Sequence, residues 1–135
     1  MAHFQYSSVS SVPGSLMPRL SLEISTETRS IQIHGIVDSG SPVSVLPYSV
    51  GAALGAVWEE QESLGMLAGA LASVESRVLP VDGMHPDIEG AEGVPLLFAW
   101  AQTNAVPVLL GQTNFLMEFN VCLYRSENAF EVWRV

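Results

Sequence analysis

The chain has 135 residues, of which 48% are hydrophobic and 14% charged, with a mean hydropathy of +0.31; this composition excludes a disordered chain and suffices for one packed domain. Five basic and fourteen acidic residues give a net charge of −9 and a pI near 4.5. Nucleic acid and anionic membrane surfaces are therefore disfavoured as partners, because both require clustered positive charge.

Targeting and redox features are few. Residues 1–20 lack the basic and continuous apolar regions of a signal peptide. The apolar runs at 64–74 and 94–101 are shorter than the ~20 residues that a membrane-spanning helix needs. The single Cys122 cannot form an internal disulfide. We therefore expect a soluble, cytoplasmic protein.

The first third of the chain predicts an arm followed by strands. Residues 1–14 are rich in serine and end in Pro13-Gly14, which predicts a flexible N-terminal arm or an edge segment before a domain over residues 15–135. Apolar and polar residues alternate over 20–25 and 31–37 with a polar turn between them, which predicts a β-hairpin. A short strand at 43–46 ends at Pro47, and a two-turn helix is predicted over 48–54.

The remaining two thirds predict short strands with little helix. Residues 58–62 are strand-like, the Gly/Ala-rich residues 64–73 suggest a mobile hairpin, and a strand follows at 74–81. After a loop at 85–93, strands are predicted at 94–101 and 106–110, a short helix over 112–119, and two final strands at 121–124 and 129–134. This pattern predicts a mostly-β barrel or sandwich with one or two short helices.

Asp38 is the candidate for chemistry among the three aspartates. It directly follows an apolar strand and precedes Ser39-Gly40, where a carboxylate is costly to bury unless it is hydrogen-bonded or shared with a partner. An Asx-type turn that satisfies its own backbone is the alternative interpretation. Asp82 and Asp87 lie among glycine and proline, as solvated turn carboxylates do.

Two distant motifs each end an apolar strand in glycine before a short helix. One is Ile36-Val37-Asp38-Ser39-Gly40-Ser41 followed by Val45-Leu46-Pro47, and the other is Leu109-Leu110-Gly111-Gln112 followed by Phe115-Leu116 and Phe119. Together, in one short chain, they resemble the retropepsin-like aspartic proteases, and most closely the bacterial members of this single-domain, retroviral type. The resemblance covers residues 16–132.

This resemblance implies a closed β-barrel and hydrolysis of peptide bonds. Members of the family use two aspartates that share one proton, so that one carboxyl acts as base while the other acts as acid. Since this chain offers one suitable aspartate, Asp38, the active enzyme would be a C2 homodimer in which Asp38 of each copy faces the other. No cofactor is implied, and the partners would be polypeptide substrates.

The resemblance also assigns roles to individual residues. Ser39 matches the residue whose hydroxyl locks the two loops together across the dimer axis, and Gly40 matches the glycine that lets a backbone amide approach the carboxylates. Substrate pockets would be lined in part by His34, Ile36, Val108 and Leu109. The flap that closes over bound peptide is matched by Leu67, Ala68, Gly69, Ala70 and Leu71. A Gly/Ala-rich inner strand is the alternative interpretation of that segment.

Three features depart from the family pattern. Pro42 stands where many members have a small or polar residue, and the flap has one central glycine where retroviral flaps have several. Gln112 stands where relatives usually carry arginine or asparagine, and in retroviral enzymes that arginine supports the dimer. These departures motivate a second hypothesis, a dimerising or peptide-binding module without catalysis on the same fold.

Other chemistry finds little support in the sequence. His3, His34, His85 and Cys122 lack metal-ligand spacing, so no metal site is predicted. There is no nucleophile elbow, P-loop or dinucleotide fingerprint.

The C-terminal strand is the predicted dimer contact. We interpret residues 129–135 as an exposed strand whose unpaired edge joins a second chain together with residues 4–9, so that deletion of residues 130–135 would weaken dimerisation. Trp58, Trp100 and Trp133 are interpreted as core or dimer-contact residues.

Overall fold

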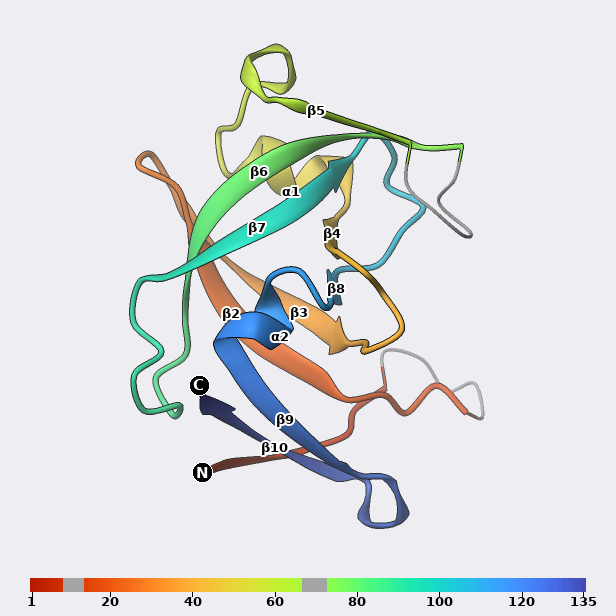
Figure 1. The fold of residues 1–135 in the computed structure, drawn as a ribbon, viewed down its shortest axis with the longest axis vertical. Coiled ribbons are helices and arrows are strands. Elements are labelled where there is room, and N and C mark those ends of the chain that lie inside the picture. Colours follow the sequence, from red (N-terminus) through yellow and green to blue (C-terminus); the bar gives the residue numbers. More distant parts are fainter. Residues whose placement is uncertain (9–13, 67–72) are drawn as a thin grey trace.

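The computed structural model describes residues 1–8, 14–66 and 73–135. In these residues the chain forms a three-stranded and a seven-stranded sheet with short helices between strands (Figure 1). The strands are β1 (Ala2–Gln5), β2 (Arg19–Ser25), β3 (Ser30–Val37), β4 (Ser44–Leu46), β5 (Ser63–Met66), β6 (Glu75–Met84), β7 (Val94–Ala101), β8 (Leu109–Leu110), β9 (Phe119–Tyr124) and β10 (Ala129–Arg134). The helices are α1 (Tyr48–Ala53), α2 (Phe115–Glu118) and the 3-10 turns η1 (Trp58–Glu60) and η3 (Arg125–Glu127). The predicted mostly-β class with two short α-helices is confirmed.

The predicted hairpin is formed by β2 and β3. The two strands pair antiparallel with Leu22 opposite Ile33. Leu20, Leu22 and Ile24 are at most 1% exposed, while the residues between them are only partly buried. Period-2 alternation therefore predicted this element, because one face of the hairpin covers the core.

The seven-stranded sheet has the order β2-β3-β8-β4-β7-β6-β5. It curves far enough for β2 to pair with β6 as well, with Ile24 opposite Gly83. Large side chains from both sheets, including Phe98, Trp100 and Phe130, are fully buried in one continuous cluster. The closed barrel stays a prediction.

Helix α1 packs against an aromatic cluster that includes Trp100 of β7. The indole Nε1 of Trp100 donates a hydrogen bond to the carbonyl of Tyr48 at 2.9 Å, and the Trp58 ring lies edge-on at 5.0 Å from the Trp100 ring. A Cβ on Gly51 would lie 2.2 Å from the Trp100 ring, so only glycine allows the helix to sit this close. The interpretation of Trp58 and Trp100 as core residues is confirmed.

Three predicted elements differ from the structure. Residues 58–62 form the 3-10 turn η1 rather than a strand, because Trp58 turns inward onto Trp100 and interrupts an extended course. The strand at 106–110 shrinks to β8, since Pro107 has no N–H to donate to a ladder. The helix over 112–119 shrinks to α2, because the backbone of residues 112 and 113 pairs with the loop that follows Asp38.

The terminal sheet corrects two further expectations. Its order is β1-β10-β9, with Phe4 opposite Phe130 and Val132 opposite Val121. β10 therefore lies between two strands of its own chain, and its predicted unpaired edge is wrong. Residues 2–5 form β1, the edge strand paired with β10, which agrees with the expected edge segment and not with a flexible arm over these residues. The two chain ends therefore lie beside each other (Figure 1). Residues 9–13 of that arm lie outside the described residues.

Candidate active site

Asp38 follows β3 at the point where the strand leaves the sheet. Val37 before it is buried, at 6% exposure, whereas Asp38 itself is half-buried. The Asp38 N–H donates to the carbonyl of Leu110 at 3.0 Å. This bond extends the β3–β8 ladder by one residue and fixes the point at which the backbone turns away from the sheet.

The turn that carries Asp38 is closed by hydrogen bonds within it. The Gly40 N–H donates to Asp38 Oδ1 at 2.9 Å, and the Ser41 N–H donates to the Asp38 carbonyl at 3.2 Å. The Asx-type turn weighed from sequence is thus present. In the described residues no hydrogen bond to Oδ2 is found, so the turn orients the carboxylate and leaves one oxygen for another partner.

Strand β8 lies between the two strands that flank this turn. It pairs parallel to β3, with Val37 opposite Leu110, and antiparallel to β4, with Val45 opposite Leu109. A Cβ on Gly111 would lie 2.3 Å from the Val43 carbonyl oxygen and 2.7 Å from that of Ser41. Backbone carbonyls cannot yield by that much, so glycine at 111 is what lets β8 reach into the loop.

The residues that follow β8 are hydrogen-bonded to the loop between Asp38 and β4. The N–H groups of Gln112 and Thr113 donate to the carbonyls of Ser41 and Pro42 at 2.9 and 3.1 Å. The Gly111 N–H donates to Ser44 Oγ at 3.0 Å, a buried bond.

One side chain completes this set of contacts. Gln112 Nε2 donates to the Ser39 carbonyl at 2.7 Å. Sequence patterns did not reveal this contact, because the two residues are 73 positions apart.

The predicted site residues separate into three groups. Asp38, Ser39 and Gly40 share the turn, and both Ser39 and Gly40 are exposed. Val108 and Leu109 are half-buried beside Ile36, whose N–H donates to the Val108 carbonyl at 3.0 Å. The expected flap, residues 67–71, lies outside the described residues.

His34 is exposed on β3, four residues before Asp38. Its Nδ1 lies 2.8 Å from Ser21 Oγ on β2. The structure therefore gives it a cross-strand partner, and its role in substrate binding stays a prediction.

A buried apolar cluster near the turn was not predicted from the sequence, although its member Leu109 was. Val45, Ala101 and Val106 are buried together, and Leu109 and Val43 pack against them. A cavity of about 100 Å³ is lined in part by Thr113 and by Val43, which lies in the loop between Asp38 and β4. Alternation of Val43 with Val45 could have placed these two on one face, but their neighbours come from β7, β8 and the loop between those strands, and so depend on the strand order.

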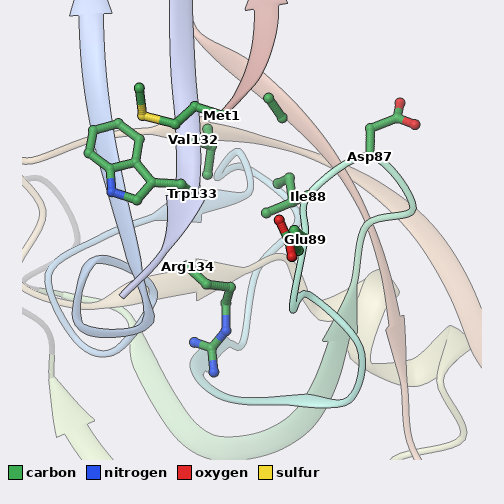
Figure 2. Close-up of a pocket in the computed structure, with 8 residues that line it drawn as sticks. Met1, Asp87, Ile88, Glu89, Val132, Trp133 and Arg134 are labelled. Atoms are coloured by element: carbon green, nitrogen blue, oxygen red, sulfur yellow. The ribbon is translucent and has the colours of Figure 1, made fainter.

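A larger cavity lies away from Asp38. It measures about 440 Å³ and lies between β1, the end of β10 and the loop 85–93 (Figure 2). The lining residues are Met1, Ala2, Asp87, Ile88, Glu89, Val132, Trp133 and Arg134. None of them belongs to the Asp38 turn, so we do not place the chemistry there.

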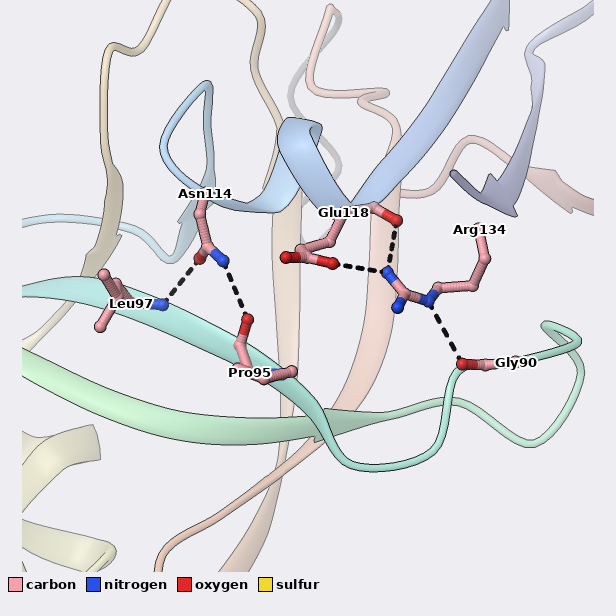
Figure 3. A network of polar contacts seen from close by, with 6 residues as sticks. All are labelled: Gly90, Pro95, Leu97, Asn114, Glu118 and Arg134. Carbon is pink, nitrogen blue, oxygen red and sulfur yellow. Dashed lines mark hydrogen bonds and ion pairs between the residues drawn. The ribbon is translucent and has the colours of Figure 1, made fainter.

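A polar network holds α2 and the chain end in place after Gln112. Asn114 uses both ends of its amide on β7, accepting from the Leu97 N–H at 2.7 Å and donating to the Pro95 carbonyl at 2.8 Å. Arg134 donates to Glu118 at 2.7 Å and to the Gly90 carbonyl at 3.2 Å. Figure 3 shows both clusters on either side of α2. Residues 112–118 are therefore anchored from β7 and from the C-terminal end.

Metal-ligand clusters and membrane-spanning helices are both absent from the described residues. Over 1–8, 14–66 and 73–135, no three His, Cys, Asp or Glu side chains are grouped so that they could hold a metal ion. No helix in these ranges has the length and apolar character needed to cross a membrane.

Comparison with known proteins shows similarity at the level of the fold. No family model matches the sequence, and no curated protein matches it. Among solved structures, the EIAV protease in complex with an inhibitor matches with a TM-score of 0.58 and 16% identity, over 80% of this chain and 92% of that one. The match supports the retropepsin-like fold, while the expected bacterial branch stays a prediction.

Proposed function

We propose that this chain is an aspartic endopeptidase that works as a homodimer. The observation that carries the proposal is the Asp38 turn, in which the Gly40 N–H orients one carboxylate oxygen at the end of β3. The turn stands in a fold similar to that of the EIAV protease. As expected from the sequence, its substrates would be polypeptides of the cytoplasm.

The proposed mechanism uses two Asp38 carboxyl groups, one from each copy. Two carboxyls held this close share one proton, because both cannot be ionised together. The ionised group takes a proton from water, whose oxygen attacks the peptide carbonyl carbon, while the protonated group gives its proton to the carbonyl oxygen. The carboxyl that took the proton from water then gives it to the amide nitrogen, the other carboxylate takes a proton from a diol hydroxyl, and the C–N bond breaks to release a carboxylic acid and an amine.

A second copy is needed because this chain places no other aspartate beside Asp38. Asp82 lies on β6 opposite Pro95, and Asp87 lies in the exposed part of the loop 85–93. Ser39 is exposed at the tip of the turn, as a residue would be that contacts the partner's turn. Residues 67–71 would close over the peptide as a flap, and Ile36, Val108, Leu109 and His34 would contact its side chains.

The first test compares wild type with Asp38→Asn, which keeps the shape of the side chain and removes its charge. Both are incubated with a denatured protein from pH 3 to 8, and the fragments are identified by mass spectrometry. We expect cleavage that favours acid pH in wild type and none in Asp38→Asn. Asp82→Asn, an exposed aspartate on β6, is the matched control and should cleave like wild type.

Subunit mixing tests the shared site. Asp38→Asn protein is added in increasing amounts to wild type at constant total concentration, after exchange of subunits. Activity should fall with the square of the wild-type fraction if each site needs two aspartates, and linearly if each copy works independently with its own aspartate. A dimer by sedimentation that cleaves nothing at any pH would instead support the non-catalytic dimerising or peptide-binding module.

A further inference from the structure

The peptide group between Ser39 and Gly40 is hydrogen-bonded at both of its ends. Its N–H, on Gly40, donates to Asp38 Oδ1 at 2.9 Å. Its carbonyl, on Ser39, accepts from Gln112 Nε2 at 2.7 Å. One planar unit thus connects the Gln112 side chain to the Asp38 carboxylate, and turning that plane would move both bonds together.

Few other contacts hold this peptide plane. Ser39 and Gly40 are exposed, and in the described part of the chain the Ser39 carbonyl has Gln112 as its one hydrogen-bond donor. Gly40 also allows rotation about its N–Cα bond, because glycine has no Cβ and restricts this rotation less than any other residue. The orientation of the N–H that faces Asp38 therefore depends on the amide of Gln112.

The backbone around Gln112 is fixed independently of its side chain. Its own N–H donates to the Ser41 carbonyl at 2.9 Å, and Gly111 before it is enclosed by the carbonyls of Ser41 and Val43. The Gln112 side chain is exposed. Removing that side chain should consequently leave the loop in place and release only the Ser39–Gly40 peptide.

We propose that Gln112 is a positioning residue for Asp38, acting through the Ser39–Gly40 peptide group. Its amide keeps the Gly40 N–H directed at Oδ1 and polarises that N–H through the shared peptide, since hydrogen bonds in a chain strengthen one another. The inference rests on the proposed function, because the orientation of Asp38 matters for catalysis only if its carboxylate reacts.

The first experiment reads the contact without requiring activity. The Gly40 amide resonance is followed by NMR while Asp38 ionises, in wild type, Gln112→Ala and the control Gln102→Ala. Gln102 is exposed in the turn after β7, and its side chain has no described hydrogen bond. When Asp38 ionises, the chemical shift of the Gly40 amide proton changes. We expect this change to be at least twofold smaller in Gln112→Ala than in wild type, and to equal that of wild type in Gln102→Ala.

The second experiment measures cleavage. In Gln112→Ala, kcat should fall by about tenfold or more while KM changes by less than about twofold, because a misdirected carboxylate affects the reacting atoms rather than peptide binding. Gln112→Glu adds a pH-dependent readout. A protonated Glu can donate to the Ser39 carbonyl and an ionised one cannot, so this variant should approach wild type near pH 3.5 and behave like Gln112→Ala above about pH 5.

The outcomes separate this inference from the proposed function. If wild type cleaves and Asp38→Asn does not, but Gln112→Ala retains both its kcat and the Gly40 shift, the role of Gln112 is refuted and the protease stands. If wild type cleaves nothing, the proposed function fails and the NMR titration still decides whether Gln112 holds the peptide. If Gln112→Glu lowers kcat by the same factor at pH 3.5 and at pH 6, the positioning role of Gln112 is also refuted.

Discussion

His85 is a buried titratable side chain outside the Asp38 turn. It is 8% exposed, its Nδ1 accepts from the Asp87 N–H at 3.1 Å, and the Phe4 ring of β1 lies against it at 5.1 Å. Burial lowers the pKa of His85, and the nearby Asp87 carboxylate opposes this to a smaller extent. A neutral ring is required because protonated Nδ1 could no longer accept the bond.

The lowered pKa predicts a pH dependence of stability. Because the folded state binds the proton more weakly than the unfolded state, unfolded chains take up more protons as the pH falls through 6.5, the ordinary histidine value, and below. The His85 contribution is therefore present above pH 6.5 and lost toward acid pH. In urea denaturation between pH 7.5 and 5, His85→Gln should show a shallower loss of unfolding free energy than wild type.

The control for this prediction is His3→Gln, which replaces an exposed histidine on β1. It should keep the wild-type slope with pH. Glutamine at 85 can still accept from the Asp87 N–H through its side-chain oxygen, so the loop should stay folded at neutral pH. Parallel slopes for wild type and His85→Gln would contradict the assignment.

Strand β10 sets the stability of the terminal sheet. Phe130 and Val132 are 0% exposed and pair with strands on both sides. The expectation that deletion of residues 130–135 weakens dimerisation therefore cannot be tested by that deletion without also disturbing the fold of each copy. Such a deletion removes buried core side chains and should unfold the sheet within each copy.

A point variant tests this role of β10 without truncation. Phe130→Ala should lower the unfolding free energy by about 3–5 kcal/mol, the usual cost of a large-to-small change in a packed core. Leu123→Ala, at the cross-strand neighbour, should cost less than about 1 kcal/mol, since Leu123 is 47% exposed. Equal losses in urea denaturation would show that β10 does not belong to the core as described.

Local patterns predicted some elements well for a physical reason. The hairpin of β2 and β3 and the strand β7 each bury side chains in a pattern set by the strand itself, so their residues carry the information. The residues of the short strand β8 and of the turn η1 do not carry such information. Their form depends on neighbours that fold in from distant parts of the chain, namely β3 and β4 for β8 and Trp100 for η1.

At the scale of the whole molecule, the net charge of −9 opposes assembly of two copies. Repulsion between like charges weakens when salt screens it, with a Debye length of about 10 Å at 0.1 M salt. Lower pH also weakens it by protonating carboxylates toward the pI of 4.5. The proposed dimer should accordingly tighten with added salt and with acidification.

Sedimentation measures this directly. The dimer dissociation constant should fall on the order of tenfold between about 20 mM and 500 mM salt at pH 7. The double variant Glu59→Gln, Glu60→Gln removes two exposed negative charges and should show a smaller salt dependence. Weaker association at high salt would mean that attraction between charged groups, rather than net repulsion, governs the interface.

The sequence by itself determined the mostly-β class, the hairpin and the position of Asp38. These follow from short-range information: alternation of apolar residues, and a carboxylate placed directly after a buried strand and before Ser39-Gly40. The presence of one such motif also led to the proposal of a second copy. The paired course of β1 and the central place of β10 were not predicted.

Only the tertiary structure decided how the turn is held. β8 enters between β3 and β4, which brings Gly111 and Gln112 onto a loop about seventy residues earlier in the chain. Local periodicity cannot encode such a placement, because it results from the order in which strands pair to bury one common core. The contact of Gln112 with the Ser39 carbonyl exists for that reason alone.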